Sequence, residues 1–160
     1  MAIQVGARLP TGTLKTMTKD GPKDLSTDEI FKGKKVVLFS VPGAFTPTCS
    51  AKHLPGFVQL ADQIMAKGVD TIACVAVNDV FVMSAWGKSA GVGEHILMLA
   101  DGNGTYAKEL GLEFDASRFG MGTRGQRFAL IVEDGVATSV DVEEPGQFKV
   151  SAAEHVLAKL

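Results

Sequence analysis

The chain has 160 residues, of which 46% are hydrophobic and 21% are charged. This length and balance fit a single folded domain over residues 1–160, and they exclude the disordered and fibrous classes of protein. With 16 basic and 18 acidic residues the net charge is −2, which gives no electrostatic basis for binding nucleic acid or anionic lipid.

The N-terminal part of the chain, residues 1–32, is interrupted by glycines and prolines. We expect it to form turns or a short hairpin added to a central sheet. Within it, Ser26 and Glu29 have the capping-box spacing, which predicts a helical turn over residues 27–31.

Apolar runs rich in Val, Ile and Phe predict buried strands over residues 35–41, 70–77, 95–100, 126–133 and 136–142. Helical spacing predicts helices over residues 46–67 and about 79–90, 105–110 and 151–159. The Asp134-Gly135 pair is typical of a tight hairpin between the last two strands. This order predicts an α/β fold, with a central mixed sheet flanked by helices on both faces and an N-terminal extension.

Cysteine and histidine are few in this sequence. The longest mostly apolar run, residues 36–41, is too short to cross a membrane, and residues 1–8 lack the features of a secretory signal. We therefore expect a cytoplasmic protein with reduced thiols, so that Cys49 and Cys74 form no structural disulfide. Cys49 and His53 together supply too few ligands for a metal site, and we expect neither metal nor cofactor.

Cys49 has the most informative position. Thr46 is a good N-cap and Pro47 suits the first helical residue, which puts Cys49 in the first turn of the longest helix. Unpaired backbone N–H groups and the helix dipole favour an anion there, so the thiol is expected to ionise readily and to act as a nucleophile, open to small oxidants at the mouth of a shallow cleft. The alternative is a small apolar cysteine that fills the strand–helix junction.

The run Pro-Gly-Ala-Phe-Thr-Pro-Thr-Cys-Ser at residues 42–50, continued by His-Leu-Pro-Gly-Phe at 53–57, resembles the active-site motif of peroxiredoxins. The resemblance is greatest to the type-II, or peroxiredoxin-5-like, branch. Further matches lie at residues 77–82, at Ala85-Trp86 and at Arg127-Phe128. The resemblance implies a thioredoxin-like fold and an antioxidant oxidoreductase, a thiol-dependent peroxidase that reduces hydrogen peroxide and alkyl hydroperoxides.

Carried over position by position, the resemblance makes Cys49 the peroxidatic cysteine, which becomes a sulfenic acid. Thr46 would hydrogen-bond the thiolate and the peroxide, and Pro42 would shield the thiolate from water. Arg127 would hold a guanidinium beside sulfur and substrate. Fixed donors of this kind stabilise the charge that moves onto the departing oxygen.

The strand pattern supports the place of Arg127 independently. If the strand over 126–133 pairs antiparallel with the one over 35–41, Arg127 lies at the end from which the Cys49 helix emerges. An ordinary surface arginine is the alternative. Arg124 would substitute if the loop 120–125 folds inward, whereas Arg118 is expected at the surface.

His53 lies one helical turn after Cys49 and is an auxiliary candidate. It would favour the thiolate electrostatically or contact a reductant, or else it is a solvent-facing histidine. Pro55 lacks an amide hydrogen and predicts a kink that would allow local unwinding around Cys49.

The sulfenic acid must be resolved by a second thiol. Cys74 lies inside an apolar strand, about 10 Å from the strand end, so we expect it to be buried packing rather than a partner for Cys49. Some type-II relatives carry a resolving cysteine in the last loop, but residues 146–152 contain none. A one-cysteine mechanism follows, with glutathione, glutaredoxin or thioredoxin as the external thiol. A redox sensor or holdase-type chaperone that uses Cys49 without sustained turnover is the alternative.

The resemblance also implies a homodimer that packs through loops near the active site. Phe45, Phe81, Trp86 and Phe119 are candidates for its apolar contacts, although each is equally suited to the core.

Overall fold

The computed structural model describes all residues, 1–160. In chain order the elements are β1 (Thr13–Thr18), β2 (Gly21–Ser26), α1 (Thr27–Phe31), β3 (Lys35–Ser40), the π-helix η1 (Cys49–His53), α2 (Leu54–Met65), β4 (Thr71–Ala76), α3 (Val80–Ala90), β5 (Ile96–Ala100), α4 (Thr105–Leu110), β6 (Glu113–Asp115), the 3-10 helix η2 (Ser117–Phe119), β7 (Thr123–Gly125), β8 (Phe128–Glu133), β9 (Val136–Val142) and α5 (Ala153–Lys159). None of the helices has the length and apolar character needed to span a membrane.

A seven-stranded sheet forms the centre of the fold, with the strand order β2-β1-β5-β4-β3-β8-β9. The strands β3, β4 and β5 run parallel, whereas β1, β2, β8 and β9 pair antiparallel with their neighbours. The mixed sheet predicted from the sequence is therefore confirmed.

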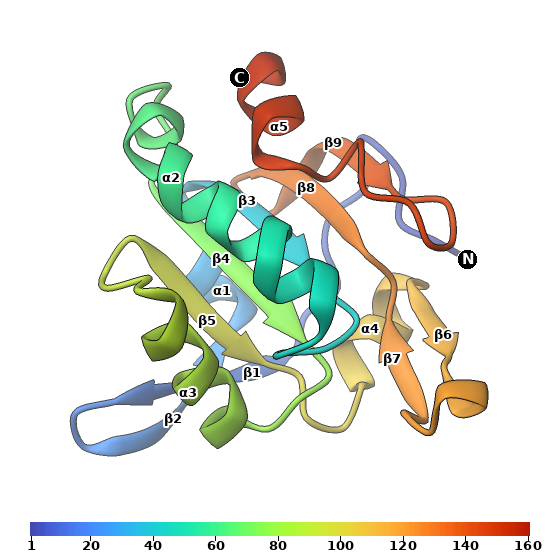
Figure 1. Cartoon of the computed structure of the whole chain (residues 1–160). Helices are drawn as coiled ribbons and strands as arrows, with labels where there is room; N and C mark the ends of the chain where they lie inside the picture. The colour runs from blue at the N-terminus through green and yellow to red at the C-terminus, as the bar shows by residue number, and fades with distance from the viewer.

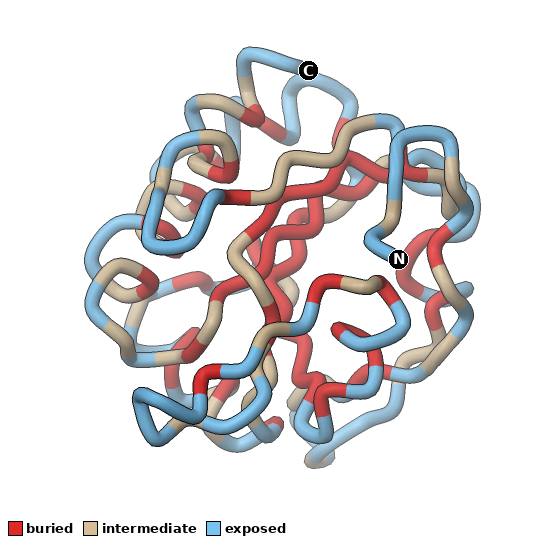
Figure 2. The backbone as a smooth tube through the Cα atoms, turned by 90° about the vertical axis from the view of Figure 1, so that its right-hand side faces the viewer, coloured by how far each residue is buried: buried red, intermediate tan, exposed pale blue.

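Helices cover both faces of this sheet (Figure 1). α2, α3 and α5 pack over one face, where 23 buried residues form the larger apolar cluster. α1 and α4 contribute Ile30, Phe31, Tyr106 and Leu110 to a second cluster of 16 residues. The tube in Figure 2 is red through the middle strands and blue in most connecting loops, as expected for a sheet covered on both sides.

The N-terminal extension joins the sheet as predicted. β1 and β2 form a hairpin, and Lys15 of β1 pairs with Ala100 of β5. The helical turn α1 has the predicted capping box, because Ser26 Oγ accepts from the Glu29 N–H and the Glu29 carboxylate accepts from the Ser26 N–H.

The pairing of β3 with β8 determines the geometry of the site described below. The two strands are antiparallel, with Ser40 opposite Phe128. The residue before β8, Arg127, therefore lies at the end of β3 where the chain turns toward η1. The Asp-Gly hairpin between β8 and β9 is also confirmed, with positive φ values of 49° at Asp134 and 80° at Gly135.

The short pair β6–β7, with η2 between its strands, was not predicted. Its strands have three residues each, too few to show an alternating pattern.

Candidate active site

Cys49 lies at the start of the long helical segment, as predicted. Pro47 and Thr48 are helical, and the Ser50 N–H donates to the Thr46 carbonyl at 2.9 Å. From Cys49 to His53 the helix widens into a π-helix, in which the Leu54 N–H reaches the Cys49 carbonyl. Pro55 follows directly, and because its nitrogen carries no hydrogen, an α-helical bond cannot form there. The interruption that Pro55 predicted therefore appears as a widened turn.

Arg127 contacts the Cys49 sulfur. Its Nη2 donates to Cys49 Sγ at 3.1 Å, and its Nη1 lies 2.7 Å from His53 Nδ1. Arg127 is half-buried, so the alternative of an ordinary surface arginine is wrong. A guanidinium in this position stabilises negative charge on sulfur.

His53 is buried, and the expectation of a solvent-facing or charged histidine is wrong. Burial away from water, followed by the neighbouring positive charge of Arg127, lowers the pKa of His53 to about 3. The imidazole is therefore neutral at physiological pH. A guanidinium carries only donors, so Nδ1 must accept and the proton sits on Nε2, which donates to the Ser151 carbonyl at 3.0 Å.

Thr46 lies in the loop before the helix, and its hydroxyl donates to the Gly43 carbonyl at 2.7 Å. It makes no hydrogen bond to Cys49, which corrects the expected bond from this hydroxyl to the thiolate. Once its proton is committed to Gly43, the oxygen is left as an acceptor. Pro42 is half-buried in the same loop, whose Ala44 N–H donates to Asn78 Oδ1 at 2.9 Å.

Arg124 and Arg118 do not reach the sulfur. Arg124 does fold inward, but its Nη1 donates to the carbonyls of Pro42 at 3.4 Å and Val77 at 3.1 Å, so it holds the loop rather than replacing Arg127. Arg118 is exposed, as predicted, and lies 5.4 Å from the Phe119 ring.

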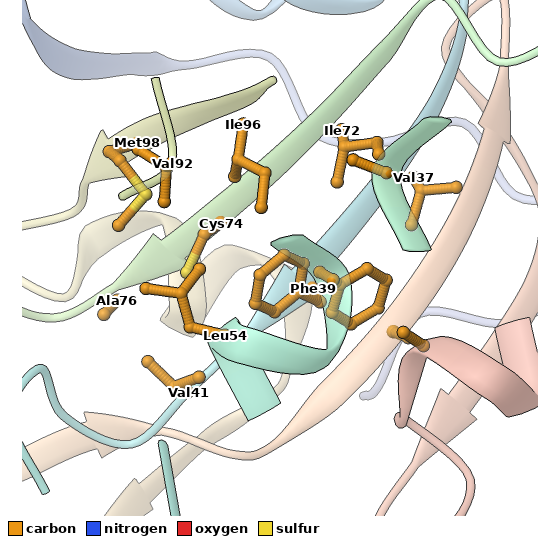
Figure 3. Close-up of a cluster of buried hydrophobic side chains, with 14 of the residues drawn as sticks. Val37, Phe39, Val41, Leu54, Ile72, Cys74, Ala76, Val92, Ile96 and Met98 are labelled. Carbon is orange, nitrogen blue, oxygen red and sulfur yellow. The ribbon is translucent and has the colours of Figure 1, made fainter. Parts of the chain in front are cut away.

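Cys49 has 0% of its surface exposed, so the expected open cleft is wrong for this state of the molecule. Cys74 is also fully buried, as predicted, and Figure 3 shows it on β4 among labelled apolar side chains. Burial raises the pKa of the Cys74 thiol well above its usual value. Both thiols are free.

The aromatic candidates divide into two groups. Trp86 is buried and its indole N–H donates to Ser50 Oγ at 2.9 Å, so it is a core residue and not a surface contact. Phe45, Phe81 and Phe119 are exposed.

Sequence reasoning missed the residues of the C-terminal loop that complete the site. Glu143 Oε2 accepts from the Ser151 N–H at 2.9 Å and from Ser151 Oγ at 2.7 Å. The Phe148 ring lies 5.0 Å from the His53 ring and 5.8 Å from the Arg127 guanidinium carbon. No local pattern marks these residues, because they meet His53 and Arg127 only in the folded chain.

The chain is similar to known proteins over nearly its whole length. The Redoxin family model matches residues 4–157. Peroxiredoxin-2C of Oryza sativa subsp. japonica is 51% identical over 99% of this chain and 98% of its own length. The chloroplastic peroxiredoxin-2E of Arabidopsis thaliana is 44% identical over 99% of this chain and 70% of its own length. Reduced Prx3 of Vibrio vulnificus in complex with hydrogen peroxide superimposes with a TM-score of 0.95 at 55% identity, covering 98% of each chain.

Proposed function

Since this chain belongs to the peroxiredoxins of the Redoxin family, which are thiol-dependent peroxidases, we propose that Cys49 is its peroxidatic cysteine. The Cys49 thiolate attacks one oxygen of the hydroperoxide, an S–O bond forms and the O–O bond breaks. Cys49 becomes a sulfenic acid, and the departing alkoxide or hydroxide takes up a proton to leave as alcohol or water.

The observation that carries the proposal is the contact of 3.1 Å between Arg127 Nη2 and Cys49 Sγ. In our proposal the guanidinium stabilises first the thiolate and then the charge on the departing oxygen. Thr46 accepts from the peroxide O–H, because its own proton is used by Gly43. Pro42 keeps water from the sulfur.

Hydrogen peroxide and alkyl hydroperoxides are the proposed substrates. The related Vibrio vulnificus protein, solved in complex with hydrogen peroxide, supports the first of these. Because Cys49 is fully buried, the residues around it must move to admit a substrate, and small peroxides require the least movement.

We assign the resolving step to an external thiol. Cys74 lies in the middle of β4 within the apolar cluster, and its thiol resists ionisation because it is buried. The loop 146–152 carries no cysteine. Glutathione, glutaredoxin or thioredoxin would therefore condense with the Cys49 sulfenic acid, releasing water, and a second thiol would restore Cys49.

Sustained turnover of hydrogen peroxide with a glutathione–glutaredoxin or a thioredoxin system tests the whole proposal. We expect many oxidations per chain, and mass spectrometry of the peroxide-treated protein should find sulfenic acid or glutathione on Cys49. A dominant Cys49–Cys74 bridge within one chain would contradict the one-cysteine cycle. One oxidation per chain, without recycling, would favour the redox sensor or the holdase-type chaperone.

We also propose that residues 1–160 act as one domain, that the protein is cytoplasmic and that it forms a homodimer. The exposed rings of Phe45, Phe81 and Phe119 supply apolar surface for the dimer contact. Sedimentation analysis of the Phe81→Asp variant tests this, because a charge in the contact should shift the protein toward the monomer.

A further inference from the structure

We propose that His53 is a positioning residue, which holds Arg127 against Cys49 and links the site to the C-terminal loop 143–151. This inference rests on the proposed function of Cys49. It concerns a ring of hydrogen bonds that includes Arg127, His53, Ser151 and Glu143 and touches the sulfur at one point.

The ring closes through side chains and backbone. Arg127 Nη1 donates to His53 Nδ1, and His53 Nε2 donates to the Ser151 carbonyl. Ser151 donates through both N–H and Oγ to Glu143 Oε2. The Glu143 N–H donates to the Arg127 carbonyl at 3.0 Å, which closes the ring. Arg127 is thus held at its backbone and at its guanidinium, and Nη2 is left to contact Cys49.

The orientation of His53 is fixed by its neighbours. Its ring centroid lies 5.0 Å from that of Phe39, 5.7 Å from that of Phe57 and 5.0 Å from that of Phe148. Between these rings the imidazole directs Nδ1 to the guanidinium and Nε2 to the Ser151 carbonyl. Fixing a donor beforehand is what makes it effective for charge that develops during a reaction.

Two charged groups, Arg127 and Glu143, act on His53. The Cys49 thiol contacts the other terminal nitrogen of the same guanidinium. Burial, followed by the repulsion of Arg127, lowers the pKa of His53 more than the Ser151 hydrogen bond and the attraction of Glu143 raise it, so His53 stays neutral. A protonated His53 would have no lone pair for Arg127, and the guanidinium would lose this anchor.

The loop side of the ring depends on one carboxylate. Besides Ser151, the Lys149 N–H donates to Glu143 Oε2 at 2.6 Å. The loop residues 144–147 are exposed, whereas Glu143 and Ser151 are buried. The bonds to Glu143 hold Ser151 in place, so a movement that carries Ser151 away from His53 removes the acceptor of Nε2 and loosens Arg127.

Two conservative variants separate the two bonds of the imidazole. In His53→Asn the side-chain oxygen takes the place of Nδ1 and preserves the acceptor for Arg127. In His53→Gln an amide N–H takes the place of Nε2 and preserves the donor to Ser151, but the acceptor for Arg127 is lost. Glu143→Gln disturbs the ring from the loop without touching the imidazole.

The readout is single-turnover oxidation by hydrogen peroxide, followed by the fluorescence of Trp86, the one tryptophan in the chain, which is bonded to Ser50 next to Cys49. We expect His53→Gln to react about tenfold more slowly than the parent, as for loss of a hydrogen bond to a charged group. His53→Asn should react faster than His53→Gln, and Glu143→Gln should lie between His53→Gln and the parent.

The decisive measurement repeats these substitutions in Arg127→Ala. If His53 and Glu143 act through Arg127, their substitution has no further effect there. Equal losses in both backgrounds, or a His53→Gln variant as fast as the parent, would overturn the inference. A parent that oxidises once but does not recycle would overturn the proposed peroxidase cycle and leave the His53–Arg127 test intact.

Discussion

Cys49 and Cys74 belong to the same apolar cluster, and neither has exposed surface. Cys49 lies where the chain leaves β3 for a helix, and a guanidinium contacts its sulfur. Cys74 lies in mid-strand, paired with Phe39 of β3 on one side and Met98 of β5 on the other. The two regions differ in their polar partners rather than in burial, so accessibility alone would not have separated the proposed nucleophile from a packing residue.

The largest effect should come from replacing Cys49, with replacement of Cys74 as the control. Cys49→Ser is expected to reduce peroxide turnover to the background rate, because a hydroxyl is not ionised at neutral pH and cannot replace a thiolate. Cys74→Ala, the matched control, should turn over at a rate close to that of the parent. Steady-state turnover with hydrogen peroxide checks both, and a Cys74→Ala variant as inactive as Cys49→Ser would end the distinction between the two cysteines.

Without the guanidinium of Arg127, Cys49 loses the polar partner that distinguishes it from Cys74, and it should react more slowly with peroxide. Arg127→Ala is expected to slow oxidation by about ten- to a hundredfold, the loss of one oriented charged donor. Arg118→Ala removes an exposed guanidinium of the same charge and should leave the rate unchanged. Stopped-flow measurement of the bimolecular rate constant separates the two, and an unaltered rate in Arg127→Ala would refute the role of Arg127.

Local signals and strand register made much of this comparison predictable. Pro47 marks the helix start that places Cys49, whereas the predicted N-cap Thr46 donates its hydroxyl to the Gly43 carbonyl instead of capping the helix. The antiparallel pairing of β3 with β8 then brings Arg127 to the sulfur, because register fixes which residues meet at a strand end. The apolar run around Cys74 correctly predicted its burial.

Contacts that no strand pairing fixes were beyond the sequence. The burial of His53 depends on Phe148 and Ser151, nearly a hundred residues further along the chain. The hydroxyl of Thr46 donates to the Gly43 carbonyl because of the conformation of the folded loop, which the residue types do not specify. No periodicity encodes either choice.

The polar surroundings of Cys49 should make stability depend on pH, through His53. The pKa of His53 is about 3 in the folded chain against 6.5 for an ordinary histidine. The contribution of neutral His53 to the stability of the folded chain is fully present above pH 6.5. It is lost as the pH falls toward 3, because the histidine of the unfolded chain takes up a proton first. For this group the free energy of unfolding should fall by about 2 kcal/mol between pH 7 and pH 5.

Urea denaturation of the parent and of His53→Phe at both pH values measures this contribution. The variant should lose less stability than the parent over the same interval. Parallel pH profiles for the two proteins would show that His53 does not remain neutral in the folded chain.

The smallest effect concerns the loop 143–151, which contacts His53 and Arg127 rather than the sulfur itself. Although burial opposes ionisation, hydrogen bonds from Ser151, Lys149 and Val150 hold the pKa of Glu143 below its usual value of 4.5. Its contribution is therefore present above pH 4.5 and is lost as the pH falls through the lower folded value. Glu143→Gln keeps the shape of the side chain but not its charge, and should lower stability by about 1 kcal/mol and Tm by about 2–4 °C at pH 7.

Calorimetry at pH 7 and in acid, with the exposed Glu144→Gln as control, checks this prediction. The difference in stability between the variant and the parent should become smaller in acid. A difference that becomes larger there would contradict the anchoring role of the carboxylate.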